Sequence, residues 1–260
     1  VQLILDGTDS ITASVVLGYA AGAGGLYELD LLQRDLGRPL FARGTAAPVE
    51  LATRVWYNEN LESRLFFVPG VIGLIVTLIT LMLTSMAIVR EKEMGTIEQI
   101  LVSPIRPVEF ILGKTLPFLL IGLADVVLVM VVGVFWFGVP VRGHVPFLFL
   151  GMLLYVLTSL SVGLLVSTVS RTQQQALMTA FFFFMPAILL SGFVFPIHNM
   201  PEVVQWITYL NPLRYLIIII RGVFLKGVGL DVLWSQYAAL ALLGIVTMFI
   251  ATKRFHKTLT

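Results

Sequence analysis

Residues 68–89 read VPGVIGLIVTLITLMLTSMAIV, a stretch of 22 residues without an ionisable side chain. A helix rises about 1.5 Å per residue, so this stretch is long enough to cross a hydrocarbon core about 30 Å thick. The next segment, residues 90–107, reads REKEMGTIEQILVSPIRP and abruptly concentrates charge. The sequence therefore predicts a membrane-spanning helix that ends at a water-facing segment.

The composition extends this prediction to most of the chain. Apolar residues make up 58% and charged residues only 12% of the 260 residues, whereas soluble domains carry about 45–50% and about 25%. A soluble globular fold and a disordered chain are both excluded on this ground. We expect an all-α polytopic membrane protein with a small extracytoplasmic α/β element. The predicted spans are residues 68–89, 115–138, 147–169, 176–195 and 234–252, and their one charged residue is Asp125.

The basic residues predict the orientation of these spans. If the loops alternate, one side receives 8 basic residues in 39 positions and the other 9 in 113. Short loops rich in Lys and Arg face the cytoplasm, so we expect the C-terminus inside and residues 1–67 outside. The net charge of +2 gives no reason to expect a nucleic-acid partner, and the lipid bilayer is the surrounding partner.

Residues 1–67 are expected to form the α/β element. Residues 1–5 and 49–57 have the residue types and alternation of strands, and residues 9–36 are the expected helix between them. About 67 residues give a marginal core. Because the chain begins with Val1, we expect a fragment that has lost an earlier part, including a first membrane helix.

The charged segment 90–107 predicts a short amphipathic helix. Met94, Ile97 and Leu101 recur at helical spacing, and Pro104 and Pro107 would end the helix. An amphipathic helix between two spans lies along the membrane face and shows its polar side to the cytosol. A solvated loop is the simpler alternative, but a loop has no need of an apolar stripe.

A second unusual segment, residues 196–226, follows the fourth predicted span on the outer side. Pro212 could open a helix with Asn211 as its N-cap. The apolar run between Arg214 and Arg221 is too short to cross the membrane. We expect a re-entrant or interfacial helix with both arginines on one face.

Two features inside the spans stand out. Ser159, Gly163 and Ser167 form a stripe of small residues that would let another helix approach closely. Asp125 is a possible intramembrane polar site because a carboxylate there is costly. Its two interpretations are substrate or proton handling and a packing role that faces the bundle interior.

No catalytic or metal-binding pattern is present. The chain has no cysteine, and its three histidines, His144, His198 and His256, are far apart, so no metal site is expected. Gly113-Lys114-Thr115 lacks the earlier glycine of a phosphate-binding loop, since position 108 is Val. We therefore expect neither enzymatic activity nor a bound cofactor, and Lys114 is interpreted as an interfacial anchor.

The charged segment also resembles a known family. It is similar to the ABC-2 type permeases, the membrane subunits of ATP-binding-cassette exporters, and within them to a branch of bacterial drug-efflux permeases. Residues 5–9 and 211–215 agree as well. The residues that carry the resemblance are Arg90, Glu91, Lys92, Glu93, Gly95, Thr96, Glu98, Gln99, Leu101, Ser103 and Pro104.

The resemblance implies six spans, of which five are present here, in the inner membrane of a bacterial cell. The segment 90–107 would be the coupling helix that docks on an ATPase subunit, which carries ATP and Mg²⁺. Glu91, Glu93 and Glu98 would pair with basic groups of that subunit, and Arg90 and Arg106 with acidic groups or lipid phosphates. The implied coupling residues are Arg90, Glu91, Glu93, Met94, Gly95, Thr96, Ile97, Glu98, Gln99, Leu101, Pro104 and Arg106.

The resemblance further implies a second permease subunit, identical or different, and a periplasmic adaptor protein. Residues 196–226 would match the outer re-entrant region, with Asn211, Pro212, Arg214, Tyr215 and Arg221 in it. The expected function is ATP-driven export of a drug-like or amphipathic substrate. The alternatives are a secondary transporter or channel, and a membrane sensor or assembly factor that does not transport.

Overall fold

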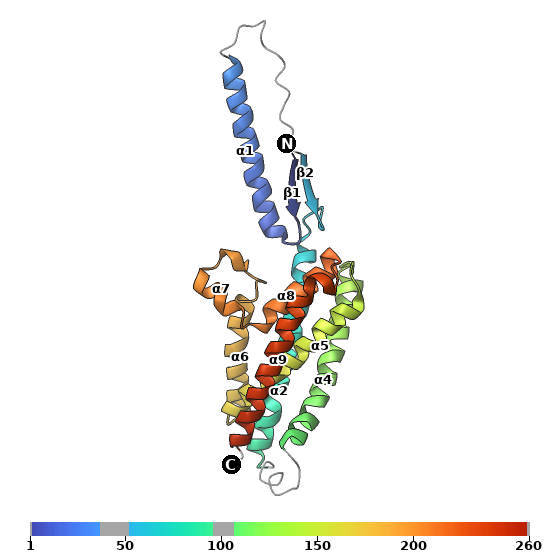
Figure 1. Cartoon of the computed structure of the whole chain (residues 1–260), viewed down its shortest axis with the longest axis vertical. Helices are drawn as coiled ribbons and strands as arrows, with labels where there is room; N and C mark the ends of the chain where they lie inside the picture. The colour runs from blue at the N-terminus through green and yellow to red at the C-terminus, as the bar shows by residue number, and fades with distance from the viewer. Residues whose placement is uncertain (1, 37–51, 96–106, 259–260) are drawn as a thin grey trace. The chain divides into compact units, whose positions relative to one another are not determined.

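The computed structural model describes residues 2–36, 52–95 and 107–258 and is mostly helical (Figure 1). The chain divides into a small unit, Val1–Phe66, and a helical unit, Phe67–Thr260. Each unit has its own internal packing and is described by itself.

The small unit contains two strands and one long helix. Strand β1, Gln2–Asp6, pairs in parallel with β2, Ala52–Trp56, and helix α1, Ser10–Leu36, lies between them in the sequence. These bounds are close to the predicted ranges. The carboxylate of Asp9 accepts hydrogen bonds from the amides of Ile11 and Thr12, both at 3.1 Å. It therefore satisfies two of the unpaired amides at the start of α1.

The helical unit is a bundle of long and short helices. A π-helical turn, Val132–Trp136, extends α4, a second one, Gly222–Lys226, extends α8, and a short 3-10 turn, Ile197–Asn199, precedes α7. The helices are α2 (Ser63–Glu93), α4 (Pro107–Val131), α5 (Val145–Val169), α6 (Gln173–Leu189), α7 (Glu202–Thr208), α8 (Pro212–Arg221) and α9 (Leu230–Thr258).

Four stretches among the described residues are long and apolar enough to cross a membrane, namely Ser63–Glu93, Gly113–Trp136, Val145–Val169 and Leu230–Arg254. A fifth span results if α7 and α8, which meet at 82°, count as one broken span. The predicted span 176–195 differs, because α6 has 17 residues and ends at Leu189. At about 1.5 Å per residue α6 is about 25 Å long.

The early end of α6 has a local cause. Gly192 adopts φ +79°, a left-handed conformation that cannot continue a helix. The hydroxyl of Ser191 accepts the amide hydrogen of Phe193 at 3.1 Å, which stabilises the turn. The number of spans in the whole bundle stays a prediction.

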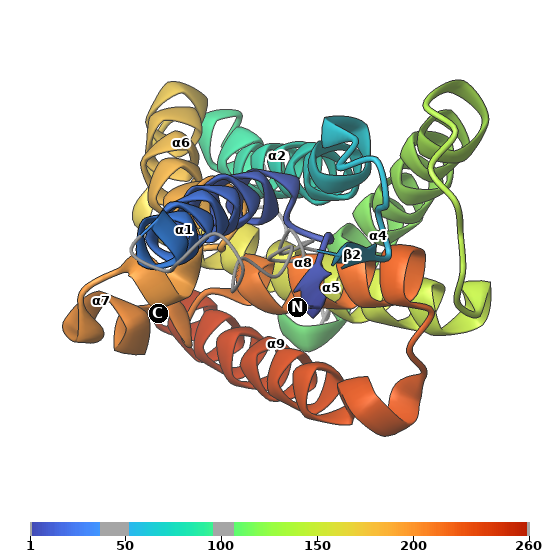
Figure 2. The ribbon, with the colours of Figure 1, turned by 90° about the horizontal axis from the view of Figure 1, so that it is seen from above.

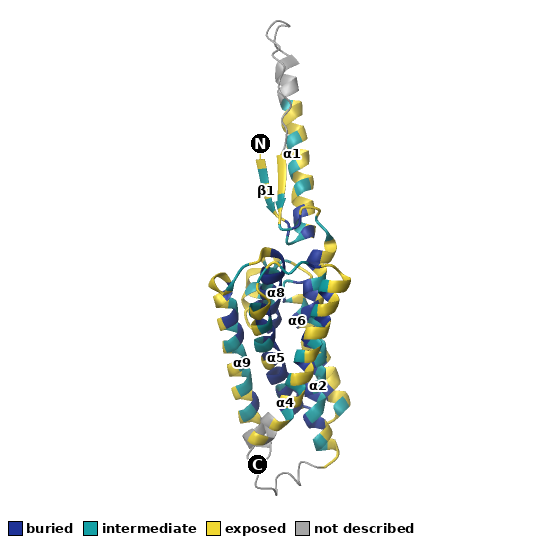
Figure 3. Cartoon of the chain, turned by 90° about the vertical axis from the view of Figure 1, so that its right-hand side faces the viewer, coloured by how far each residue is buried: buried dark blue, intermediate teal, exposed yellow. Residues whose placement is uncertain are grey.

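Helices α5 and α8 form the interior of the bundle. Figure 2 shows both between α2 on one side and α9 on the other. The burial colours in Figure 3 agree: α5 and α8 are largely buried. Helices α4 and α9 bury much less and expose large apolar side chains such as Leu120, Leu128, Ile245 and Phe249. Outward apolar faces of this kind suit a lipid environment rather than water.

The predicted stripe of small residues on α5 packs against α2. The hydroxyl of Ser159 lies 2.7 Å from that of Thr80. A Cβ atom added at Gly163 would lie only 2.8 Å from the Cβ of Thr84, so the two helices are as close there as glycine allows. The carbonyl of Ser167 accepts a hydrogen bond from Lys92. The prediction that this stripe permits close approach is confirmed, and its partner is α2.

Candidate functional site at the end of helix α2

Helix α2 ends in four charged residues, Arg90 to Glu93. We expected a span that ends at Val89 and a separate helix from Arg90. Instead α2 continues without interruption through Glu93, because the amide of Met94 still bonds to the Arg90 carbonyl at 3.1 Å. Gly95 then adopts φ +72° and ends the helix. The predicted start of a separate helix at Arg90 is therefore wrong, and residues 96–106 lie outside the described part of the chain.

Glu91 forms an ion pair inside the chain. Its carboxylate lies 2.5 Å from the ammonium group of Lys114, in the second turn of α4. The pair connects the end of α2 to the start of α4. Glu91 therefore has a basic partner within its own chain, and Lys114 is that ion-pair partner. The expected pairing of Glu91 with another subunit stays a prediction.

Lys92 binds the carboxyl end of α5. Its ammonium group donates to the carbonyl of Ser167 at 2.9 Å and reaches the carbonyl of Ser170 at 3.5 Å. The last carbonyls of a helix lack partners within the helix and carry partial negative charge. The half-buried ammonium group of Lys92 satisfies these carbonyls.

Glu93 binds the amino end of α6. Its carboxylate accepts from the backbone amide of Gln173 at 2.8 Å and from the side-chain amide of Gln173 at 2.5 Å. Thr172 caps the same helix by accepting from the amide of Gln175 at 3.1 Å. Negative charge is favourable at a helix start. Glu93 therefore has hydrogen-bond partners within the chain, and its expected pairing with another subunit stays a prediction.

We call this cluster the charged junction: Glu91, Lys92 and Glu93 of α2 with Lys114, Ser167, Ser170 and Gln173. Lys92 and Gln173 were not among the predicted site residues. A signal for them was present, because only a short turn separates α5 from α6. Their facing ends must therefore lie at the same membrane face as residues 91–93.

The other predicted coupling residues divide into two groups. Arg90, Met94 and Gly95 are exposed at the end of α2. The following residues lie outside the described part of the chain: Thr96, Ile97, Glu98, Gln99, Leu101, Pro104 and Arg106. Their role in coupling stays a prediction.

Asp125 lies within α4, where its carboxyl is partly buried. Its Oδ2 atom is enclosed by protein and has no hydrogen-bond partner among the described residues. A packing role through a hydrogen bond of Oδ2 is therefore not observed. Whether this carboxyl handles a substrate or a proton stays a prediction.

The segment around Asn211 forms a sharp turn between α7 and α8, which we call the elbow (Thr208–Tyr215). Asn211 caps α8, as predicted, by accepting the amide hydrogen of Leu213 at 3.1 Å. Its side-chain nitrogen donates to the carbonyl of Ala187 in the last turn of α6 at 2.7 Å. Asn211 therefore satisfies an end group of each of two helices.

The side chains of Arg214 and Tyr215 hold the same elbow. The guanidinium of Arg214 lies 4.0 Å from the ring centre of Tyr209 and donates to the hydroxyl of Thr208. The hydroxyl of Tyr215 donates to the carbonyl of Tyr209 at 2.8 Å.

Arg214 and Arg221 share one face of α8, as the sequence predicted. Both are only partly buried, whereas most other residues of this helix are buried. A guanidinium nitrogen of Arg221 donates to the carbonyl of Gly192 at 3.4 Å, which joins the end of α8 to the turn after α6.

We predict that Asn211→Ala destabilises the helical unit by about 1–2 kcal/mol, because it removes a cap and leaves the Ala187 carbonyl without its donor. Thermal unfolding in detergent measures the effect. Asn199→Ala is the matched control, because Asn199 is exposed. This variant should unfold at the same temperature as the parent protein. Equal melting of both variants would contradict the structural role of Asn211.

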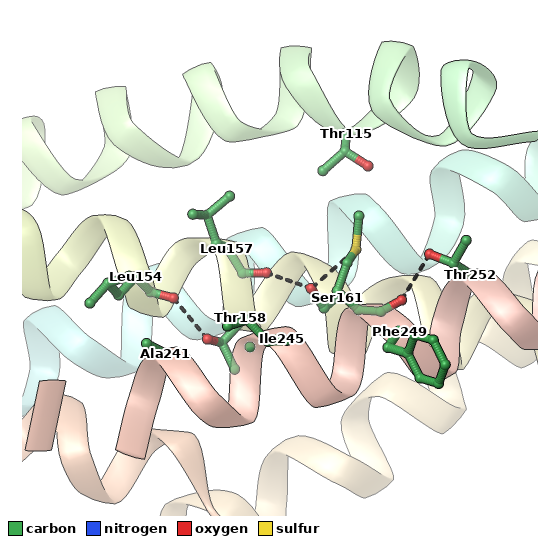
Figure 4. A pocket seen from close by; sticks show the side chains of 11 residues that line it. Thr115, Leu154, Leu157, Thr158, Ser161, Ala241, Ile245, Phe249 and Thr252 are labelled. Atoms are coloured by element: carbon green, nitrogen blue, oxygen red, sulfur yellow. Dashed lines mark hydrogen bonds between the residues drawn. The ribbon is translucent and has the colours of Figure 1, made fainter. Parts of the chain in front are cut away.

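An apolar crevice of about 460 Å³ lies between α5 and α9, with Thr115 of α4 at its edge (Figure 4). Its walls include Leu154 and Leu157 of α5 and Ile245 and Phe249 of α9. The Thr158 hydroxyl donates to the carbonyl of Leu154 at 2.8 Å and reaches that of Leu240 in α9 at 3.3 Å, so its hydrogen is already used. The lining suits alkyl or aromatic groups.

No group of three or more His, Cys, Asp or Glu side chains gathers in an arrangement for a metal ion within residues 2–36, 52–95 and 107–258. These features define a multi-pass membrane protein: apolar helices of membrane length, a charged junction at the end of α2 and a bent helix pair.

Comparison with known proteins identifies the family. Residues 30–225 match the family model described as ABC-2 type transporter, and the chain belongs to this family. It is 35% identical over 256 residues to the probable multidrug ABC transporter permease YbhR of Escherichia coli K12, covering 98% of this chain and 67% of that protein.

Two further relatives agree. The chain is 35% identical over 261 residues to the probable multidrug ABC transporter permease YbhS of Escherichia coli K12, again covering 98% of this chain and 67% of that protein. It is 33% identical over 232 residues to the inner membrane transport permease YhhJ of the same strain, covering 87% of this chain and 59% of that protein. The chain is thus a membrane permease of the ABC type.

Proposed function

We propose that this chain is the membrane-spanning subunit of an exporter driven by ATP hydrolysis on a separate ATPase subunit. Its cargo would be a drug-like or amphipathic, lipid-like molecule, taken from the cytoplasm or the inner leaflet. Membership of the ABC-2 family, with two relatives named as multidrug permeases, carries the proposal. The apolar crevice between α5 and α9 is compatible with the apolar part of such a cargo.

In this proposal the charged junction faces the cytoplasm, residues 1–67 lie outside, and the C-terminus lies inside the cell. The permease would act as a homo- or heterodimer with two ATPase subunits, which bind ATP and Mg²⁺, while this chain binds no cofactor. A periplasmic adaptor is a further proposed partner, suggested only by the family resemblance. A secondary transporter is the second candidate, because Oδ2 of Asp125 is buried in a span and has no hydrogen-bond partner in the part of the chain that the structure describes.

The proposed mechanism needs a contact that differs between two states of the ATPase. ATP binding would bring the two ATPase subunits together, and residues 96–106 would follow the surface on which they dock. Because α2 and α4 lie directly before and after this segment, its movement reaches both helices. The Glu91–Lys114 ion pair would keep their ends together during the movement.

We predict that Glu98→Lys lowers ATP-dependent efflux at least about tenfold in the complete complex, since it reverses one charge of the proposed docking face. The partner's basal ATPase activity should remain, while its stimulation by substrate is lost. The measurements are ATP hydrolysis and efflux in proteoliposomes, with and without a proton gradient.

The matched control is Glu59→Lys, the same charge change at an exposed residue of the small unit, which should leave transport unchanged. Normal efflux by the Glu98→Lys variant would reject docking through that face. Efflux that needs a proton gradient but no ATP would reject the exporter proposal in favour of secondary transport.

A further inference from the structure

Three consecutive residues at the end of α2 bind three different helices. Glu91 contacts α4, Lys92 contacts the carboxyl end of α5, and Glu93 contacts the amino end of α6. The α5–α6 turn, residues 170–172, is therefore held between two adjacent side chains of opposite charge. An ordinary solvated turn would need neither contact.

We propose that Lys92 and Glu93 are positioning residues that couple α5 and α6 to the movement of the end of α2. The inference rests on the proposed function, because it names further helices that must move when the ATPase subunit pulls on residues 96–106. On this view the ATPase acts on four helices through one junction, rather than on α2 and α4 alone.

Glu93 is exposed, and what favours this role is that its carboxylate makes two hydrogen bonds to the first residue of α6. Glu93 holds both the first amide of α6 and the side chain of Gln173, at 2.8 and 2.5 Å. Hydrogen bonds to a charged group are shorter and about twice as strong as neutral ones. Two such bonds to one carboxylate fix the orientation of the helix end as well as its distance from Glu93.

Helix α6 is held at its other end as well. The carbonyl of Ala187, in its last turn, accepts from the side chain of Asn211, which caps α8. A helix is stiff along its axis, so α6 connects the charged junction at its start to the elbow at its end. A movement of Glu93 would thus reach α8 through α6.

The two kinds of contact in the junction respond differently to an exchange of charges. Glu91 and Lys114 form an ion pair between two side chains, so an exchanged pair, E91K/K114E, can form again. Lys92 and Glu93 face helix ends whose partial charges are fixed by the backbone. An exchanged K92E/E93K variant therefore places both charges at the wrong ends, although its net charge is unchanged.

The first experiment tests the contact itself. Because the chain has no cysteine, Met94→Cys and Arg171→Cys, both exposed, can carry spin labels without background. Electron–electron resonance in nanodiscs should give one narrow distance distribution in the parent and in E91K/K114E. It should broaden in K92E/E93K. A distribution that stays narrow in K92E/E93K would overturn the proposed contact.

The second experiment tests coupling in the complete complex with its ATPase. We expect K92E/E93K to lose efflux and substrate-stimulated ATPase activity by about tenfold, since two favourable helix-end contacts become unfavourable. Basal ATPase activity should stay within about twofold. The E91K/K114E complex should keep both activities.

If K92E/E93K shows a broadened distance distribution but parent-like efflux, the contact exists in the parent and its coupling role is overturned. A parent complex without ATP-dependent efflux would overturn the proposed function and the coupling role together, although the label distances would still report the contact. If K92E/E93K fails to fold, Glu93→Gln and Lys92→Gln replace it and should lower efflux in the same direction. Their control is Glu59→Gln, an exposed residue of the small unit, which should keep parent activity.

Discussion

Gly163→Leu should force α2 and α5 apart and destabilise the helical unit by about 3 kcal/mol or more. A Cβ at position 163 would already lie 2.8 Å from the Cβ of Thr84 and 3.2 Å from the carbonyl oxygen of Leu81. The carbonyl belongs to the backbone of α2 and cannot rotate away. The helices must therefore separate, which also displaces Ser159 from Thr80.

Gly113→Leu is the matched control, because a Cβ at position 113 of α4 would meet open space. It should unfold at the parent temperature, whereas Gly163→Leu should unfold well below it or fail to accumulate. Gly163→Ala should lie between them. Unfolding of the purified protein by heat or by SDS, followed by circular dichroism, measures the series. Equal stability at the two positions would show that α2 and α5 do not approach as closely as described.

Thr77→Val should destabilise the helical unit by about 1–2 kcal/mol, because it leaves the buried hydroxyl of Tyr155 without a partner. Thr77 donates its one hydroxyl hydrogen to the carbonyl of Gly73, so Tyr155 donates to Thr77 across a 2.5 Å contact. Tyr155 is about 1% exposed, and water cannot replace the lost acceptor.

The double variant Thr77→Val/Tyr155→Phe should recover most of this loss, since it removes both polar groups together. Unfolding of the parent, both single variants and the double variant completes a double-mutant cycle. Strictly additive losses would mean that the two hydroxyls do not interact. This test distinguishes a buried polar contact between two spans from the packing effect of Gly163.

The charged junction narrows the surface available to a partner subunit. Of the acidic residues expected to face the ATPase, Glu91 and Glu93 are already bound to Lys114 and Gln173. The charge of a segment is thus by itself no guide to its partner when helix ends and a lysine lie nearby. Under the proposed function, docking would depend on residues 96–106 and on the exposed side chains of Arg90 and Met94.

Much of the fold follows from local sequence. Uncharged stretches about 20 residues long must cross a membrane, and Asp9, Asn211 and Pro212 mark helix starts through side chains that cap or pre-shape a first turn. The small-residue stripe on α5 also predicted a close helix contact. In each case the residues that decide the local structure are close together in the sequence.

The tertiary structure decided what these elements meet. Periodicity marks a face but cannot identify its partner, so the sequence did not show that the stripe faces α2 or that Lys92 reaches α5. The end of α2 was misplaced because we assumed that the charged residues would end the helix. Arg, Glu and Lys are good helix formers, so the helix continues through them. Sequence alone determined that this is a bundle of membrane helices with one charged end, because the apolar length of each helix is visible in consecutive residues. Only the packed bundle decided that this charge binds the bundle's own helix ends, because those partners are 23 to 80 residues away along the chain.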